Sequence, residues 1–298
     1  MKSLFSKKFI IAVFCVVALG AGLFAFFALQ KNNVPESVSI ITTPLELKVE
    51  SPERKVLGLS VEGREIESYK FGKGKTQLIF VGGIHGGYEW NSVILAYEFM
   101  DYLKANLEFI PENLSITVIP SLNPDGVFKI IGKEGRFTVA DVPAGSNGAG
   151  RLNAHAVDLN RNFDCKWKPK GLWGTKEVSC GSRPFSEPES MAIRKFVLEN
   201  NPTAVIFWHS KSNGVYASYC EADILQETRD IMNTYSKVSG YPAYETFDQY
   251  EVTGDASDWL ASIGIPAISV ELKTHETIEW EQNLAGIQAL FKYYENKN

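Results

Sequence analysis

The sequence predicts an α/β protein: a single domain built on a mixed, largely parallel twisted sheet with helices covering both faces. Short apolar runs typical of buried strands alternate along the chain with longer amphipathic runs typical of helices. This alternation favours parallel strands joined by helical crossovers. The 298 residues are 45% hydrophobic and 22% charged, which is ordinary for a globular protein. A net charge of −5 gives no reason to expect nucleic acid as a partner.

The domain is predicted to begin with a hairpin and to continue with alternating strands and helices. Residues 56–71 alternate between apolar and polar side chains around Glu62-Gly63, as in two strands joined by a turn. The helix at 187–200 has the clearest start, because Ser186 suits the cap, Pro188 the first turn and Glu189 the capping box. Further strands are predicted at 77–81, 115–120, 204–208 and 267–272, and further helices at 91–107, 224–239 and 276–295.

The N-terminal segment predicts a membrane anchor ahead of this domain. Three lysines precede an uncharged apolar run, residues 9–29, and a membrane-spanning helix needs about 20 such residues. The lysines before the run place residues 1–8 in the cytoplasm and the rest of the chain outside. The largely polar residues 30–54 then form a tether, and residues 55–298 form the domain. A cleaved signal peptide, which would release a secreted protein, is the alternative.

The cysteines suggest a disulfide in the outer domain. Cys15 lies in the apolar N-terminal run, whereas Cys165, Cys180 and Cys220 lie in the domain. Cys165 and Cys180 bracket a loop rich in lysine and glycine, and in an oxidising compartment this spacing suits a disulfide between them. Cys220 is then left free. The alternative is three unpaired thiols.

An imidazole and a carboxylate lie where a predicted buried strand gives way to a helix. His85 and Glu89 follow the apolar run 78–81 and precede the amphipathic run 91–107. The carboxyl ends of such strands are where α/β proteins place ligands and chemistry. His209 ends another apolar run, 205–208. Two histidines and one glutamate make a three-ligand zinc site with room for water, although a lone histidine is more often a packing residue.

Two more polar groups extend this candidate site. Glu271 closes the apolar strand 268–272, and a carboxylate there is costly to bury unless the protein uses it. A general base is one use, and a structural ion pair is the alternative. Arg161 stands between two asparagines, a setting that suits bidentate binding of a carboxylate. Asp158 is predicted to accept a hydrogen bond from the nitrogen of His85 that faces away from the metal.

Taken in order along the chain, these residues resemble the zinc carboxypeptidase family. The resemblance covers about Val56 to the C-terminus and includes an early hairpin and a Pro-Phe-Ser-Glu-Pro-Glu segment similar to that of bacterial members. The motifs that carry it are His85/Glu89, Asn123-Pro124-Asp125-Gly126, Asp158-Leu159-Asn160-Arg161-Asn162, His209-Ser210, Glu271, Ser60-Val61-Glu62-Gly63-Arg64 and Pro184-Phe185-Ser186-Glu187-Pro188-Glu189.

The resemblance implies a role for each site residue. One zinc ion would be bound by His85, Glu89 and His209. Glu271 would be the general base and then the proton donor to the leaving amine, while Arg151 would stabilise the oxyanion. Asn160, Arg161 and Tyr250 would bind the terminal carboxylate of the substrate.

The first ligand pair departs from the family pattern. The family usually has two residues between histidine and glutamate, whereas here Gly86, Gly87 and Tyr88 intervene. Glycines tolerate unusual backbone angles, so the pair is expected to absorb the extra residue. His155 and His275 are expected outside the metal site, His155 on the surface or just behind the site and His275 at a helix start.

The expected function is hydrolysis, outside the cytoplasmic membrane, of the C-terminal bond of a peptide with a free carboxylate. Zinc would be the cofactor, and the N-terminal helix would hold the protein to the membrane. Cell-wall peptides are a possible substrate within the same chemistry. Two alternatives stay open: a zinc amidohydrolase that deacylates small N-acyl amino acids, and a non-catalytic membrane-tethered peptide-binding protein.

Overall fold

The computed structural model describes residues 51–145 and 148–297. The predicted cytoplasmic N-terminus, the anchor at 9–29 and nearly all of the tether lie outside the described residues. Among the described residues, no helix combines the length and the apolar character needed to cross a membrane. The first strand, β1, begins at Glu53, so the last two residues assigned to the tether belong to the sheet.

The predicted sheet is present and is parallel at its centre. In the described part of the chain, eight strands form one sheet in the order β1-β2-β4-β3-β7-β10-β8-β9. Strands β4, β3, β7 and β10 run parallel to one another, and β1 and β2 pair antiparallel with their neighbours. Strand β8 pairs antiparallel with β10 and parallel with β9. The bounds are β1 Glu53–Leu59, β2 Glu65–Gly72, β3 Thr76–Val81, β4 Leu114–Ile119, β7 Ala204–Ser210, β8 Gly214–Ala217, β9 Ala243–Tyr244 and β10 Ala267–Leu272.

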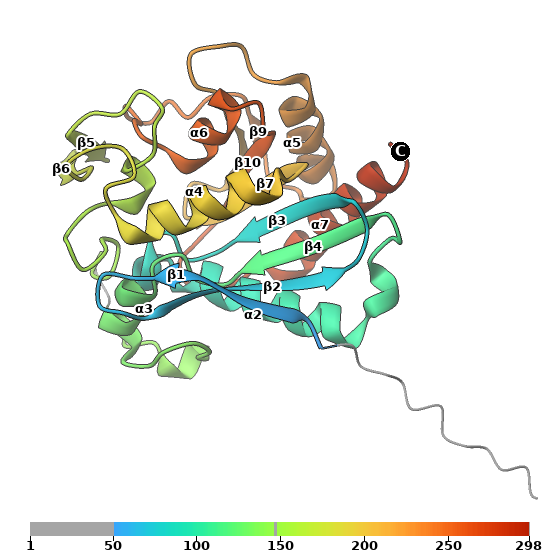
Figure 1. The fold of residues 1–298 in the computed structure, drawn as a ribbon, viewed down its shortest axis with the longest axis horizontal. Coiled ribbons are helices and arrows are strands. Elements are labelled where there is room, and N and C mark those ends of the chain that lie inside the picture. Colours follow the sequence, from blue (N-terminus) through green and yellow to red (C-terminus); the bar gives the residue numbers. More distant parts are fainter. Residues whose placement is uncertain (1–50, 146–147, 298) are drawn as a thin grey trace, which may run out of the picture. The chain divides into compact units, whose positions relative to one another are not determined.

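Helices cover both faces of this sheet (Figure 1). The two faces follow from the alternation of side chains along each strand. In β3, Leu78 and Phe80 pack with α2, α5 and α7, whereas Ile79 and Val81 pack with α4 and α6. The helices are α2 Trp90–Ala105, α3 Pro124–Ile131, α4 Pro188–Asn200, α5 Gln226–Ser239, α6 Ala256–Ser262 and α7 Trp280–Glu295.

The long elements agree with the prediction, and the short ones were not predicted. The hairpin, four strands and four helices all lie within a few residues of their predicted ranges, but α7 begins four residues late. Glu279, just before α7, has a left-handed backbone with φ 48°. The elements missed are α3, α6, β8, β9, the hairpin of β5 (Lys170–Trp173) and β6 (Lys176–Ser179), and the short 3-10 turns, among them η1 (Gly86–Glu89) and η4 (Leu159–Arg161).

The start of α3 carries a signal that could have revealed it. The Asn123 side chain accepts a hydrogen bond from the backbone nitrogen of Gly126 at 2.9 Å, and Pro124 occupies the first turn. Asparagine followed by proline is a recognised helix start. This turn matters for the site because Gly126 packs directly against the loop that carries His85.

The predicted disulfide between Cys165 and Cys180 is wrong. Cys165 bonds to Cys220 instead, across 55 residues of sequence and a Cα–Cα distance of 5.8 Å. Cys180 is a free, buried thiol. The correct partner follows β8, which pairs with β10 near the centre of the sheet. The loop between Cys165 and Cys180 folds into the β5–β6 hairpin, which pairs with itself instead of closing on Cys165.

Replacing Cys220 with alanine should lower the free energy of unfolding by about 2–4 kcal/mol under oxidising conditions, because the bridge restricts the unfolded chain. Cys180→Ala is the matched control and should cost less, since it breaks no covalent bond and removes only packing and one weak thiol hydrogen bond. Urea denaturation with and without reductant measures both effects, and reductant should bring the parent chain close to Cys220→Ala. An intact Cys165–Cys180 peptide in a non-reducing digest would contradict the assignment.

Candidate metal centre and active site

The site lies at the carboxyl ends of the parallel strands. His85 lies four residues after β3, His209 is near the end of β7, and Glu271 is near the end of β10. The strand register places His209 directly opposite Glu271. Since neighbouring parallel strands end at one edge of the sheet, residues far apart in sequence meet there. They line a cavity of about 420 Å³.

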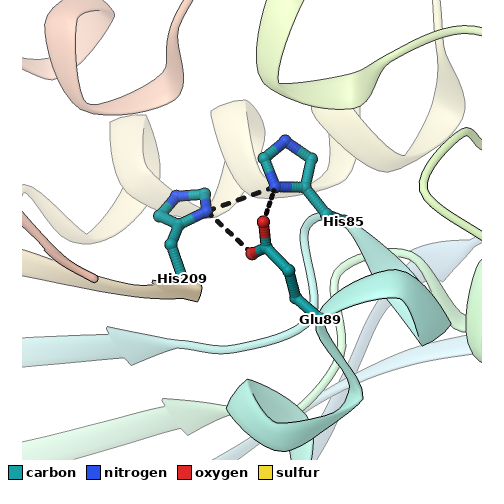
Figure 2. Close-up of side chains that lie close together, drawn as sticks. All are labelled: His85, Glu89 and His209. Atoms are coloured by element: carbon teal, nitrogen blue, oxygen red, sulfur yellow. Dashed lines mark hydrogen bonds and ion pairs between the residues drawn. The ribbon is translucent and has the colours of Figure 1, made fainter. Parts of the chain in front are cut away.

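His85, Glu89 and His209 bring three candidate metal-ligand atoms close together (Figure 2). These three residues are the metal group. Nδ1 of His85 lies 2.7 Å from Oε1 of Glu89, and Nδ1 of His209 lies 3.1 Å from Oε2 of Glu89. The two Nδ1 atoms are 3.3 Å apart, and all three residues are buried. A tetrahedral zinc ion with ligands at about 2.0–2.1 Å places its ligand atoms about 3.3 Å apart, so this donor set fits zinc.

The electrostatics of the group also suit a cation. Burial by itself would raise the pKa of the Glu89 carboxyl, but His85 and His209 lower it well below its usual range. Burial lowers the pKa of His209, yet Glu89 outweighs burial and the pKa is raised. The buried carboxylate therefore stays ionised and draws positive charge toward itself.

The two glycines accommodate the extra residue between the ligands. Gly86 has φ 49°, a left-handed conformation that favours glycine. A Cβ atom on Gly86 would lie 2.6 Å from the backbone oxygen of Gly150, and one on Gly87 would lie 2.7 Å from that of Gly126. The loop therefore passes close against neighbouring backbone as the turn η1, and Glu89 reaches His85 and His209.

Glu271 lines the same cavity as the metal group. Its Oε2 accepts a hydrogen bond from the backbone nitrogen of Ser212 at 3.0 Å. Burial raises the pKa of Glu271, and the nearby His209 opposes this rise only in part. A carboxyl group with a raised pKa is suited to taking and returning a proton near neutral pH.

Arg151 and Asp158 form a buried pair beside the metal group. Nε of Arg151 donates to Oδ2 of Asp158 at 2.9 Å, and Nη1 lies 3.7 Å from Oε1 of Glu89. Against the effect of burial, Arg151 and His85 hold the pKa of Asp158 well below its usual range. Asp158 was predicted to accept a hydrogen bond from His85. The distance from Nε2 of His85 to Oδ1 of Asp158 is 3.4 Å, which is longer than a normal hydrogen bond. Arg151 is thus the closer partner of Asp158.

Asn160 and Arg161 are held rigidly on η4. Nη1 of Arg161 donates to the backbone oxygen of Asn160 at 2.6 Å, while Nε and Nη2 donate to that of Leu172 at 3.1 and 3.0 Å. Nδ2 of Asn160 donates to Asp255 at 2.7 Å. The guanidinium carbon of Arg161 lies 6.0 Å from the ring centre of Tyr250. All three predicted carboxylate-binding residues line the cavity.

The cavity includes residues that the sequence did not single out, among them Tyr88, Lys166, Trp173 and Tyr219. Tyr88 alone carried a signal, because it stands between the two predicted ligands. Asp258 also lines the cavity and accepts a hydrogen bond from the backbone nitrogen of Tyr219 at 3.0 Å. Burial and the neighbouring Asp255 raise the pKa of Asp258 to about 8.

The two remaining histidines lie outside the metal group. His155 is exposed, and its Nδ1 lies 2.7 Å from Oε2 of Glu187. His275 is half-buried in the loop before α7, not at the helix start where it was predicted. Its Nδ1 lies 2.7 Å from Oγ of Ser210, the residue that follows the ligand candidate His209.

Comparison with known proteins identifies the class to which this fold and site belong. The sequence model of the zinc carboxypeptidase family matches residues 47–288. The chain therefore belongs to the zinc carboxypeptidase family, a family of metallocarboxypeptidases that use zinc.

The individual relatives agree with this assignment. Carboxypeptidase B of Astacus astacus is 28% identical over 231 residues, which are 70% of this chain and 74% of the relative. Bacteriocin BCN5 of Clostridium perfringens is 35% identical over 147 residues, which are 48% of this chain but only 15% of the bacteriocin.

Solved structures share the fold at low sequence identity. Bovine thrombin-activatable fibrinolysis inhibitor, in complex with tick carboxypeptidase inhibitor, has a TM-score of 0.66 and 20% identity, covering 82% of this chain and 90% of that one. The murein-tripeptide amidase of Escherichia coli O157 has a TM-score of 0.55 and 19% identity, covering 79% and 92%.

Asp258 should contribute more to the stability of the protein in acid than at neutral pH. Its carboxyl has a pKa near 3.9 when unfolded but about 8 when folded, so its contribution is complete below about pH 4 and is lost as pH rises through 8. Urea denaturation between pH 4.5 and 8.5 should show the unfolding free energy of the parent chain falling, relative to Asp258→Asn, by at least about 1 kcal/mol. Parallel pH profiles for the two proteins would contradict this.

Proposed function

We propose that this protein is a zinc-dependent exopeptidase that hydrolyses the C-terminal peptide bond of peptides. The observation that carries the proposal is that one cavity holds a group fit for zinc, a carboxylate with a raised pKa and a fixed arginine. Membership of the zinc carboxypeptidase family supports it.

His85, Glu89 and His209 would hold the zinc ion, which supplies a Lewis acid that polarises the scissile carbonyl and makes water a better nucleophile. Glu271 accepts the proton of the attacking water and then donates it to the leaving amine. The carboxylate suits this exchange because burial raises the pKa of Glu271, while the backbone nitrogen of Ser212 donates to Oε2 and positions the group.

Arg151 donates hydrogen bonds to the oxyanion that develops on the scissile carbonyl. Its guanidinium is positioned before substrate arrives, because Asp158 accepts from Nε and Glu89 lies close to Nη1. Preorganised donors of this kind need no rearrangement during the reaction, which is the source of their catalytic effect.

Arg161 selects for a free terminal carboxylate. An arginine side chain has five N–H donors, and three of these already bond to backbone oxygens of Asn160 and Leu172. One N–H remains on each terminal nitrogen, which is the arrangement that binds a carboxylate in bidentate fashion. Asn160 and Tyr250 lie beside it and add hydrogen bonds, so the enzyme cleaves at the chain end.

We further propose that the protein acts outside the cytoplasmic membrane, anchored by residues 9–29. The disulfide between Cys165 and Cys220 supports this location, since such bonds persist mainly in oxidising compartments. Peptides that are present there, including those of the cell wall, would be the substrates. Cell fractionation and alkali extraction of the full chain test the anchor, and a protein recovered wholly in the soluble fraction would exclude it.

Glu271→Gln should reduce kcat by about 10³-fold, because an amide cannot take the proton of the attacking water. Zinc content should stay at about one per chain, since Glu271 lies outside the group of ligand atoms. Peptide hydrolysis and metal analysis of the same preparation measure both. Turnover near the parent rate would contradict the mechanism, and a parent chain that takes up no zinc would favour a non-catalytic binding protein.

A peptide ending in a carboxamide should be cleaved about 100-fold more slowly than the same peptide with a free carboxylate, because the charge-assisted bonds to Arg161 are lost. Tyr250→Phe should narrow this difference, since the hydroxyl contributes one of the bonds. Tyr244→Phe, at an exposed tyrosine outside the cavity, is the matched control. Equal rates on the two peptides would contradict exopeptidase action and favour an amidase without a terminal requirement.

A further inference from the structure

The loop from His85 to Glu89 is one residue longer than in the usual family pattern, and Tyr88 is the side chain that this longer loop provides. Gly86 and Gly87 pack so closely against the backbone of Gly150 and Gly126 that neither position has room for a side chain. The first side chain after His85 that can project is therefore Tyr88. It is half-buried and lines the same cavity as the metal group.

The ring of Tyr88 is held between two aromatic neighbours. Trp173 of β5 packs against it edge to face, with ring centres 5.0 Å apart, and the ring centre of His275 lies 4.5 Å away. His275 is fixed in turn: its Nδ1 lies 2.7 Å from Oγ of Ser210, which donates to Oδ1 of the fully buried Asn91 at 2.9 Å. Through His275, the Tyr88 ring is therefore positioned by Ser210 of β7 and Asn91 of α2.

The hydroxyl of Tyr88 is available to a ligand. No hydrogen-bond partner for it exists among the described residues, although the ring around it is fixed on two sides. The hydroxyl is not among the buried atoms without a partner, so it is open to the cavity. A ring fixed by its neighbours with its hydroxyl open to a cavity can bind a ligand at little cost in conformational entropy.

Arg151 shows which part of a substrate this ring would meet. The guanidinium carbon of Arg151 lies 4.8 Å from the ring centre of Trp173 and 5.7 Å from that of Tyr88. In the proposed reaction Arg151 binds the scissile carbonyl, which belongs to the residue on the amino side of the cleaved bond. Tyr250, which holds the terminal carboxylate, packs on a different aromatic ring, that of Phe247, at 4.9 Å.

We propose that Tyr88 and Trp173 form the binding subsite for the residue that precedes the scissile bond. This aromatic pair favours a flat or large apolar side chain there, and the Tyr88 hydroxyl donates to a backbone carbonyl of the same part of the peptide. The inference rests on the proposed function for the direction in which the peptide lies. A well-placed aromatic contact makes the preference for phenylalanine over glycine about tenfold.

The test measures binding and not turnover, so that it does not depend on catalysis. Zinc-loaded Glu271→Gln protein is titrated by calorimetry with two N-acetylated dipeptides that share a C-terminal residue and carry phenylalanine or glycine before it. The phenylalanine peptide should bind about tenfold more tightly. Adding Tyr88→Ala should bring the ratio close to one. Adding Tyr88→Phe should weaken both peptides equally and keep the ratio, because only the hydroxyl is lost.

Two further variants separate the subsite from general effects. Trp173 lies outside the loop from His85 to Glu89. Trp173→Leu should therefore lower the ratio of the two binding affinities even if Tyr88→Ala were to lose zinc or fold poorly. Phe247→Ala removes a cavity aromatic beside Tyr250 and should leave the ratio unchanged. A ratio that persists in both Tyr88→Ala and Trp173→Leu, a ratio of one in the parent, or no binding of either peptide overturns the inference.

The outcome is distinguishable from failure of the proposed function. If the chain with Glu271 intact hydrolyses no peptide, exopeptidase action is contradicted, while the binding ratio and its dependence on Tyr88 are still measured. If peptides are hydrolysed but the ratio does not depend on Tyr88 or Trp173, the subsite is contradicted and the catalytic proposal stands.

Discussion

The ionised carboxylate of Glu89, buried between two imidazoles, is the constraint on which the rest of the site depends. Removing a charge from water is costly unless opposite charge or a metal ion compensates it. His85 and His209 lower its pKa, and Arg151 lies within 3.7 Å. Asp158 then balances Arg151. A divalent cation at this point would complete the compensation, so the polar core of the protein is arranged around one place for positive charge.

The side of the cavity that we propose to bind the substrate carboxylate is positioned largely by backbone oxygens, with one contribution from the side chain of Asp255. Arg161 is aligned by the backbone oxygens of Leu172 and Asn160, and Asn160 is held by Asp255 at the start of α6. The β5–β6 hairpin positions cavity residues, because the backbone oxygen of Leu172 orients the guanidinium of Arg161 and the ring of Trp173 lies 4.8 Å from the guanidinium carbon of Arg151. Rigid placement of this kind lowers the entropy cost of binding a substrate.

Much of the fold could be predicted from the sequence, since long strands and helices express their burial as a regular period of apolar side chains. The site candidates followed from polar residues at the ends of those apolar runs, as with His209 and Glu271. The short helix α6 and the β5–β6 hairpin could not be predicted, because four to seven residues carry too little periodicity. The disulfide was mispredicted because proximity in sequence does not establish proximity of Cα atoms.

The sequence by itself determined the order of the long strands and helices, the chemical types of the site residues and the resemblance to a family, since all three are properties of local pattern. The tertiary structure alone decided what those residues contact. It brought Glu89 to His85 and His209 despite an extra residue, joined Cys165 to Cys220 and placed Tyr88 between Trp173 and His275. Such contacts depend on which strands lie side by side and on how closely backbones approach, and no local pattern encodes either.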